Sequence, residues 1–381
     1  MSQVKLGDVA VESRETYKGD KTGMPIVGLE HITPGEVTLS NWDTDTDNTF
    51  TKRFRKGDML FGRRRAYLKK AAQAPFDGIC SGDITVIRAK EDCLLPELLP
   101  FIIQNDNLFD FAVGKSAGSL SPRVKWDNLK NYTFELPPMD EQKKLAKVLW
   151  SINDTLQAYQ KLFTETDALV QAQFVEMFGD PITNDKGWEM TTLGNVADIR
   201  IGPFGSLLHK GDYIEGGHAL VNPSHIVGGK IISDEKLTIS DEKYEELSAY
   251  KLKKGDLVLG RRGEMGRCAV VNCDGLLCGT GSLIIRPTGK IRPFFLQKIL
   301  SSPSYRTVIE GKAVGITMKN LNVPIVSSLS LPLFPVSLQN KYIDFVQQSN
   351  KSQSALQNTI TSLQTTKRHI LENALGTGRK E

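Results

Sequence analysis

The stretch Lys56-Gly57-Asp58-Met59-Leu60-Phe61-Gly62-Arg63-Arg64 recurs 198 positions later as Lys254-Gly255-Asp256-Leu257-Val258-Leu259-Gly260-Arg261-Arg262. At the same offset, Cys80 corresponds to Cys278 and Ile87-Arg88 corresponds to Ile285-Arg286. Self-similarity at a fixed offset indicates a duplicated structural unit. We therefore interpret the chain as two copies of one unit.

Further identities extend the repeat on both sides of this block. Near the start of each copy, Leu6-Gly7-Asp8-Val9-Ala10 resembles Leu193-Gly194-Asn195-Val196-Ala197. Five more identities follow at an offset one residue shorter than that of the block: Gly114-Lys115 with Gly311-Lys312, Gly118 with Gly315, Pro138 with Pro335, and Gln142 with Gln339.

Each copy combines a region of short strands with one long helix. Strands such as Ile84–Ile87 and Leu283–Ile285 are bounded by Gly, Asp and Pro turn residues. We predict that the helices begin at Asp140 and Ser337, which are N-cap residue types at equivalent positions. They should end at Gly179 and Gly376, where a C′ glycine belongs. A helix of this length spans about 60 Å at 1.5 Å per residue.

Apolar residues in both predicted helices alternate between spacings of four and three, from Leu145 to Met177 and from Tyr342 to Ala374. A sustained 3.5-residue period predicts a coiled-coil seam, so we expect the two helices to pair with each other. The alternative is that each helix lies on its own globular domain. Polar residues interrupt the second seam and imply a loose or partner-shared stretch: Ser349, Gln353 and Lys367.

Composition excludes several classes of protein. With 381 residues and 40% hydrophobic residues, the chain can bury two or three domain cores, so disorder is not its dominant state. No stretch approaches the roughly 20 apolar residues of a membrane helix, and the N-terminus lacks the apolar core of a signal peptide. Five cysteines without a regular framework favour a reducing compartment. We therefore expect a cytoplasmic protein.

Motif fragments suggest no catalytic or metal site. Gly114-Lys115-Ser116 imitates the end of a P-loop, but Phe109 stands where a glycine is required. Asn222-Pro223-Ser224-His225 lacks the second proline and the aromatic residue of an amino-methyltransferase loop. The five-residue spacing of Cys268, Cys273 and Cys278 does not fit structural zinc, and we expect these thiols to be buried in strands. An active site within this chain is not expected.

Basic residues at corresponding places in both copies are candidates for DNA contact. Arginine suits bidentate contact with guanine edges and with phosphates. Alternatively, one arginine of each pair faces solvent or anchors a carboxylate such as Asp58 or Asp256. The candidates following the repeated strand are Arg63, Arg64, Arg65, Tyr67 and Lys69 in copy one, and Arg261 and Arg262 in copy two.

Two further segments are candidates for DNA contact. Small residues interleaved with Lys, Ser, Thr and Arg suit hydrogen bonds to phosphate, although a plain surface loop has the same composition. This type of loop places Lys115, Ser119 and Arg123 in copy one and Lys312, Thr317 and Lys319 in copy two. A segment without a sequence match in copy one adds Phe204, Ser206, His209 and Lys210.

In this order, the motifs resemble the specificity subunit of type I restriction-modification systems over essentially the whole chain. The resemblance rests on the doubled plan and on four segments: Gly28-Leu29-Glu30-His31-Ile32, the Lys-Gly-Asp…Gly-Arg-Arg strands, Pro137-Pro138-Met139-Asp140-Glu141-Gln142, and Phe178-Gly179-Asp180-Pro181. Copy two departs at the helix start, where it has Val336-Ser337-Leu338-Gln339.

The resemblance implies an α+β protein with internal pseudo-twofold symmetry. Its target-recognition domains would be residues 1–138 and 180–335, and its helical spacers, antiparallel to each other, residues 139–179 and 336–381. Each recognition domain would read one half of a bipartite double-stranded DNA target, and the helices would set the gap.

The resemblance also implies that this chain is not catalytic. It would bind two methyltransferase subunits, which modify adenine, and through them the restriction/translocase subunits. S-adenosylmethionine, ATP and Mg²⁺ would be bound by those partners, and no cofactor by this chain.

Two other classes of function stay open from the residues alone. One is a protein–protein adaptor whose β-rich domains bind peptides, and the other is an enzyme with an unrecognised site. Salt-dependent retention on DNA would argue against the adaptor, because phosphate contacts release counterions. Turnover by the isolated chain would support the enzyme.

Overall fold

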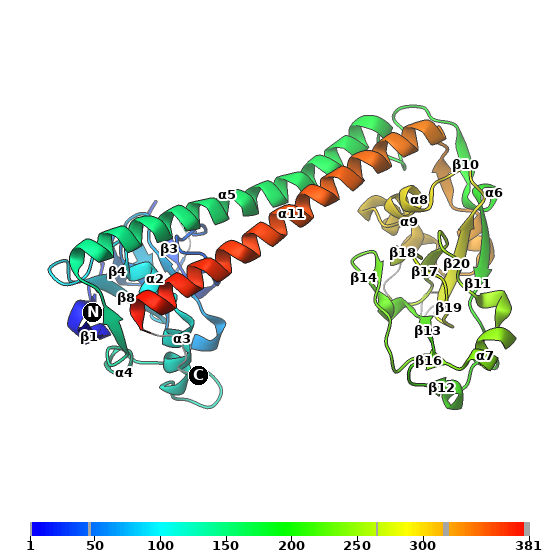
Figure 1. The fold of residues 1–381 in the computed structure, drawn as a ribbon. Helices are drawn as coiled ribbons and strands as arrows, with labels where there is room; N and C mark the ends of the chain where they lie inside the picture. The colour runs from blue at the N-terminus through cyan, green and yellow to red at the C-terminus, as the bar shows by residue number, and fades with distance from the viewer. Residues whose placement is uncertain (1, 45–46, 264–265, 315–319, 377–381) are drawn as a thin grey trace. The chain divides into compact units, whose positions relative to one another are not determined.

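Strand and helix contacts divide the chain into two units, Met1–Phe163 with Ser354–Glu381, and Thr164–Gln353. The structure is a computed structural model that describes residues 2–44, 47–263, 266–314 and 320–376 (Figure 1). Each unit contains one β-rich region and part of both long helices, since α5 (Met139–Phe178) and α11 (Val336–Leu375) both pass from one unit to the other. The fold is α+β, as predicted.

The same four-stranded antiparallel sheet occurs in both units. In the first unit its order is β2 (Ala10–Glu12), β8 (Ile84–Ala89), β5 (Met59–Gly62) and β6 (Ala71–Gln73). In the second unit the order is β11 (Ala197–Ile201), β20 (Ser282–Pro287), β17 (Leu257–Gly260) and β18 (Cys268–Val270). The repeated Lys-Gly-Asp block thus leads into β5 and β17, so the duplication deduced from sequence is confirmed.

Smaller pairings repeat as well. A parallel pair joins β3 (Ile26–Val27) to β7 (Gly78–Cys80), and its counterpart joins β13 (His218–Val221) to β19 (Leu277–Cys278). The strand that precedes each long helix pairs with the first strand of its copy: β9 (Thr133–Leu136) with β1 (Ser2–Lys5), and β21 (Ser330–Pro332) with β10 (Met190–Thr192).

Short helices cover each β-rich region. The first unit has α1 (Leu6–Val9), α2 (Leu99–Ile103), α3 (Asp106–Gly114) and α4 (Trp126–Leu129). The second has α6 (Leu193–Val196), α7 (Asp241–Glu246), α8 (Pro293–Leu300), α9 (Pro303–Lys312) and α10 (Val323–Ser327). Further strands are β4 (Lys52–Phe54), β12 (Tyr213–Ile214), β14 (Ile226–Val227), β15 (Lys230–Ile231) and β16 (Thr238–Ile239).

Both long helices end as predicted but begin earlier. Gly179 and Gly376 have positive φ angles of 73° and 60°, which suits the C′ position. At the other end, the carbonyls of Pro138 and Pro335 accept the first helical hydrogen bonds. The predicted caps Asp140 and Ser337 are therefore wrong, because they lie inside the first turn.

The long helices pack against each other and also on the β-rich regions, so the two predicted arrangements coexist. In the second unit, Tyr342 Oη of α11 donates to the Val170 carbonyl of α5 at 3.3 Å, and Gln353 Nε2 donates to Asp167 at 2.7 Å. Tyr342 also belongs to the core beneath the sheet. In the first unit, Leu149 of α5 and Leu371 and Leu375 of α11 share the core of the β-rich region.

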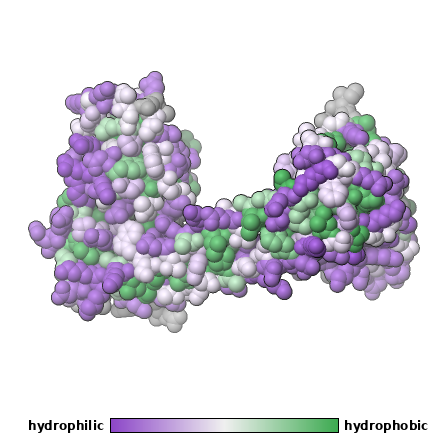
Figure 2. Space-filling view, turned by 90° about the horizontal axis from the view of Figure 1, so that it is seen from above, coloured by the Kyte–Doolittle hydropathy of each residue, from purple (hydrophilic) through white to green (hydrophobic). Residues whose placement is uncertain are grey.

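The described residues contain no helix that is both long and apolar enough to cross a membrane. Within the same residues, no group of His, Cys, Asp and Glu is arranged to hold a metal ion. Cys268 and Cys278 are buried in β18 and β19, but Cys273 is exposed, so the expectation that all three are buried is wrong for Cys273. Figure 2 shows hydrophilic residues interspersed with hydrophobic ones on the visible surface of both units.

Candidate nucleic-acid interface

The repeated Asp of the Lys-Gly-Asp block is bound by the repeated Arg of the following strand. Asp58, only 2% exposed, accepts the Arg55 backbone N–H at 2.8 Å and two hydrogen bonds from Arg88, at 2.7 and 2.8 Å. In copy two, Asp256 accepts the Lys253 N–H at 2.8 Å and two bonds from Arg286, at 2.7 and 2.6 Å. Arg88 and Arg286, and not the Arg-Arg pairs, thus bind these two carboxylates, although Arg64 pairs with another carboxylate, Asp83, and Arg262 faces solvent.

Arg63 and Arg261 hold equivalent backbone positions at the ends of β5 and β17. The N–H of Arg63 donates to the Asp83 carbonyl at 3.0 Å, and its carbonyl accepts from Val124 at 3.0 Å. The N–H of Arg261 donates to Gly281 at 3.0 Å, and its carbonyl accepts from Leu321 at 3.1 Å. Each residue thus ties its strand end to two loops.

The side chains of this equivalent pair lie in different environments. Arg261 is only 7% exposed, and its Nε donates to Asn320 Oδ1 at 3.1 Å. Burial, and then the charge of Arg262, lower the pKa of the Arg261 guanidinium. Arg63 is half-buried, and its Nε is enclosed without a hydrogen-bond partner in the described part of the chain. Arg262 is exposed.

In the first unit, the structure brings together two loops that the sequence suggested separately. Arg64 Nε donates to Ser121 Oγ at 2.6 Å, and the Arg65 N–H donates to the Pro122 carbonyl at 2.8 Å. Arg64 and Arg123 both pair with Asp83, at 3.5 and 2.8 Å. The hydrogen bond from Arg123 is the main cause of the lowered pKa of Asp83. Two guanidinium groups thus share one carboxylate.

A cleft of about 840 Å³ opens beside this cluster. Four basic side chains and two acidic ones line it: Arg14, Lys52, Arg63, Arg123, Glu15 and Asp83. The remaining lining residues are Thr16, Thr49, Phe50, Thr51, Ser81 and Gly82. Burial lowers the pKa of Lys52, whose Nζ donates to the Ile84 carbonyl at 2.6 Å.

The segment after β2 was missed as part of this cleft because it has no sequence match in copy two. Ser13 follows β2 and Gly202 follows β11, which is two residues longer than β2, and the Ser13 and Gly202 N–H groups donate to Val86 and Ser282 at 2.8 and 3.0 Å. The segment with Arg14 and Thr16 and the segment with Phe204 and Ser206 therefore both leave the outer strand of the repeated sheet. Comparing the strand order of the two copies could have revealed Arg14 and Thr16. Comparing their residues could not, because the two segments share no identities.

The other candidates of copy one lie nearby along the chain. Arg65 and Lys69 have positive φ angles of 54° and 51° on either side of the 3₁₀ turn η2 (Ala66–Leu68), where Tyr67 is exposed. Lys69 pairs with Asp106 at 2.5 Å. Lys115 lies 5.9 Å from the Phe111 ring centroid. Ser119 is exposed.

The candidates of copy two are mostly exposed. The side chains of Phe204, Ser206, His209, Lys210 and Lys312 all face solvent. The first four follow Gly202, whose bond to Ser282 places the start of their segment beside Gly281, the acceptor of the Arg261 N–H. Thr317 and Lys319 lie outside the described residues.

The methyltransferase-like tetrapeptide is a structural turn with a counterpart in copy one. Asn222 caps η4 (Pro223–His225), just as Gly28 caps η1 (Leu29–His31). The Nδ1 atoms of His225 and His31 lie 3.3 and 3.0 Å from the backbone nitrogens of Asn222 and Gly28. The two histidines are buried equivalents that the sequence comparison missed, because only the histidine and the following isoleucine are shared.

Fold and cleft together define a duplicated α+β protein in which each β-rich region is joined to a pair of long helices. Residues 1–162 match the family model described as type I restriction modification DNA specificity domain. Among curated proteins, the MjaVIII specificity subunit of Methanocaldococcus jannaschii is 20% identical over 58% of this chain and 56% of that protein. The EcoBI specificity subunit of Escherichia coli is 24% identical over 60% and 53%.

Two solved structures share the fold along nearly the whole chain. A chain from a structure on complex assembly and conformational transition of the type I restriction-modification system has a TM-score of 0.63 and 20% identity, covering 98% of this chain and 97% of that one. The type I S subunit from M. genitalium has a TM-score of 0.60 and 12% identity, covering 98% and 96%.

The first 162 residues thus match the specificity-domain model, and the chain is similar to specificity subunits of type I restriction-modification systems. It spans about half the length of the curated relatives it matches.

Proposed function

We propose that the chain is the DNA-specificity subunit of a type I restriction-modification complex, in which each β-rich region reads one half of a bipartite double-stranded target. The observation that carries this proposal is the cluster of Arg64 and Arg123 around Asp83, at the edge of a cleft that also contains Arg14 and Lys52. Similarity to type I specificity subunits supports the same proposal.

The charge balance of the cleft favours an anionic ligand. Asp83 is shared by Arg64 and Arg123, and Glu15 is paired with Arg55 and Arg88. The four basic side chains that line the cleft outnumber its two carboxylates, although Arg14 also pairs with Glu12 at 3.1 Å. Guanidinium and ammonium groups in such a cleft suit contacts with DNA phosphates, and arginine also suits guanine edges.

Partners of this chain would supply the chemistry of the complex. We propose that the chain is non-catalytic and binds two methyltransferase subunits, and through them restriction/translocase subunits. Those partners would hold S-adenosylmethionine, ATP and Mg²⁺, and modify or cut the DNA in the cytoplasm. Exposed apolar side chains at heptad spacing on α5 support docking of a protein on the helices: Val148 and Leu162 in the first unit and Leu169 in the second.

DNA retention tests the proposal. The full chain with its methyltransferase subunits should bind duplex DNA with an affinity that falls steeply between about 50 and 200 mM salt. Methylation mapping in the native host should yield a two-part target. Binding that is insensitive to salt, or the absence of a methylated bipartite sequence, would contradict the proposal and favour a peptide-binding adaptor.

A further inference from the structure

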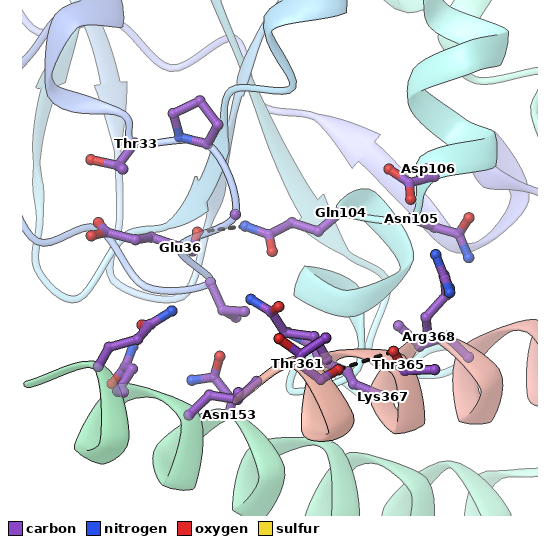
Figure 3. A pocket seen from close by; sticks show the side chains of 18 of the residues that line it. Thr33, Glu36, Gln104, Asn105, Asp106, Asn153, Thr361, Thr365, Lys367 and Arg368 are labelled. Carbon is purple, nitrogen blue, oxygen red and sulfur yellow. Dashed lines mark hydrogen bonds between the residues drawn. The ribbon is translucent and has the colours of Figure 1, made fainter. Parts of the chain in front are cut away.

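A cavity of about 660 Å³ lies between the β-rich region and the two long helices of the first unit (Figure 3). Its walls come from residues 33–37, from the junction of α2 and α3 at Gln104–Asp106, and from facing stretches of α5 and α11. Polar side chains dominate the helical walls: Asn153, Gln157, Gln160, Thr361, Gln364 and Thr365.

Lys367 lines this cavity, and no acidic partner for it lies among the described residues. Within the described residues, its Nζ is at ion-pair distance from no carboxylate, and it lies 5.0 Å from the centroid of the Phe101 ring. Burial lowers its pKa to about 8. Across the cavity, Asn153 is 5% exposed and its Nδ2 has no hydrogen-bond partner there. In the part of the chain that the structure describes, both groups are donors without an acceptor.

Two of the acidic residues in the cavity wall are already engaged. Asp106 pairs with Lys69 at 2.5 Å, and Glu36 accepts a hydrogen bond from Ser40 at 2.5 Å. Glu372 completes the acidic wall, but it forms no ion pair with Lys367 in the described chain. An ammonium group removed from water without a partner destabilises the fold, so an incoming carboxylate would relieve that cost.

The second unit contains the equivalent cavity, of about 740 Å³. At the offset that relates Gln142 to Gln339, Asn153 corresponds to Asn350 and Gln104 to Ser301, and both counterparts line it. The roles of the long helices are exchanged, because Asp167, Val170 and Gln171 of α5 stand where α11 stands in the first unit.

A partly buried ammonium recurs in this second cavity from the opposite wall. Lys298 occupies the position of Phe101, and Val170 occupies the position of Lys367. Burial is the main cause of its lowered pKa, and its Nζ lies 5.4 Å from the Phe294 ring centroid. Asp167, the carboxylate facing it, accepts a hydrogen bond from Gln353. Each unit thus places a partly buried ammonium in its cavity, from α11 in the first unit and from α8 in the second.

We propose that the two cavities are sockets that each receive one acidic side chain from a partner protein, and that two copies of the same partner occupy them. The inference rests on the proposed function, which identifies that partner as the methyltransferase subunit. In each cavity a partly buried ammonium lies beside polar side chains and suits a carboxylate. Further basic side chains line both cavities: Arg368 in the first, and Lys230, Arg267 and Arg306 in the second. Leu156 and Leu371 in the first wall suit the methylene stem of the incoming side chain. Two equivalent sockets account for two partner copies.

Binding stoichiometry tests the proposal with the full chain and its own purified methyltransferase subunit. Lys367→Met and Lys298→Met remove the charge but retain an unbranched apolar side chain. Each single variant should weaken partner binding at its own site at least about tenfold. At limiting partner concentration, only the unchanged site should then be occupied. The double variant should retain neither. Matched controls are Lys147→Met on α5 and Lys351→Met on α11, both exposed, which should change affinity less than about twofold.

Melting temperature and DNA retention distinguish the socket from a small-anion site and from a wrong choice of partner. The Met variants should melt no lower than wild type, because they remove a desolvated charge. Two partner copies bound by the double variant would overturn the socket. Inorganic phosphate that raises the melting temperature of wild type but not of the variants, with partner binding unchanged, would also overturn it and identify a small-anion site. A wild-type chain that retains DNA but binds no partner would overturn the proposed partner together with the sockets.

Discussion

Gln142 and Gln339 make the same three hydrogen bonds at the starts of the two long helices. Gln142 Oε1 accepts from the Leu95 N–H at 2.9 Å, and its Nε2 donates to the carbonyls of Cys93 and Pro137 at 3.2 and 3.0 Å. Gln339 accepts from Arg292 at 2.8 Å and donates to Lys290 and Phe334 at 3.2 and 2.8 Å. Each glutamine fastens its helix to the preceding loops of the same copy.

Replacing either glutamine should destabilise its own unit. Gln142→Ala and Gln339→Ala each leave one backbone N–H and two carbonyls without their partner, at a cost of about 1–3 kcal/mol. Urea unfolding of each variant measures this loss. The exposed Gln357→Ala serves as the control and should stay within about 0.5 kcal/mol of wild type. Equal stability of all three variants would show that the helix starts are held by other contacts.

The Asp58–Arg88 pair should matter for folding and not for the choice of DNA sequence. Asp58→Asn removes the charge that binds Arg88, and Asp256→Asn does the same for Arg286. Hydrogen bonds to charged groups contribute about 1.5–3 kcal/mol, so each variant should lose about that much free energy of unfolding. Its urea midpoint should fall accordingly. Competition binding with half-site variants should give an unchanged order of preference. A changed order would assign the pair to recognition.

The repeat shows how far sequence alone could reach. Matching blocks predicted the duplication, the strands and both long helices, because these depend on local patterns of apolar residues and glycine. The same blocks could not reveal that Asp58 binds Arg88 or that Arg261 is enclosed, since both facts depend on contacts between segments distant in sequence. Arg14 was missed for the related reason that the two copies share strand order but not residues at this point.

Arg64 and Arg123 should act on the half-site read by copy one. If they contact phosphate, Arg64→Ala or Arg123→Ala should weaken binding to all sequences and lower the salt slope by about one. If one of them reads a base edge, its loss should relax specificity in one half-site by about 1–3 kcal/mol. Competition binding at two salt concentrations distinguishes these results. Unchanged affinity and salt slope in both variants would exclude this cluster from the DNA contact.

In copy two, we expect Arg261 to stabilise the fold and Arg262 to contact DNA. Arg261 is enclosed and bonded to Asn320, so Arg261→Ala should lower the melting temperature. Arg262 is exposed, so Arg262→Ala should leave melting unchanged and weaken DNA binding, with any loss of specificity confined to the second half-site. Thermal unfolding and competition binding on both variants measure the difference. Identical behaviour of the two variants would contradict this assignment.

The pH dependence of stability should reveal the partly buried ammonium of Lys367. Its pKa is lowered from 10.5 to about 8 in the folded chain, so the unfolded chain binds the extra proton between these values. The stability advantage of Lys367→Met should therefore be full below about pH 8 and should disappear toward pH 10.5. Charged neighbours in the same cavity are Glu36, Asp106, Arg368 and Glu372. Urea unfolding across this range measures the difference, and the exposed Lys147→Met should show no such trend.

The two long helices should act as a ruler for the gap between half-sites. Each is 40 residues long and passes from one unit to the other, so its length should control the separation of the recognition regions. Inserting one heptad after Phe163 and another before Ser354 adds about 10.5 Å to each helix. The gap in the methylated target should then grow by about three base pairs at 3.4 Å each. An insertion into one helix alone should disrupt their register and abolish binding. An unchanged gap after the double insertion would exclude the ruler.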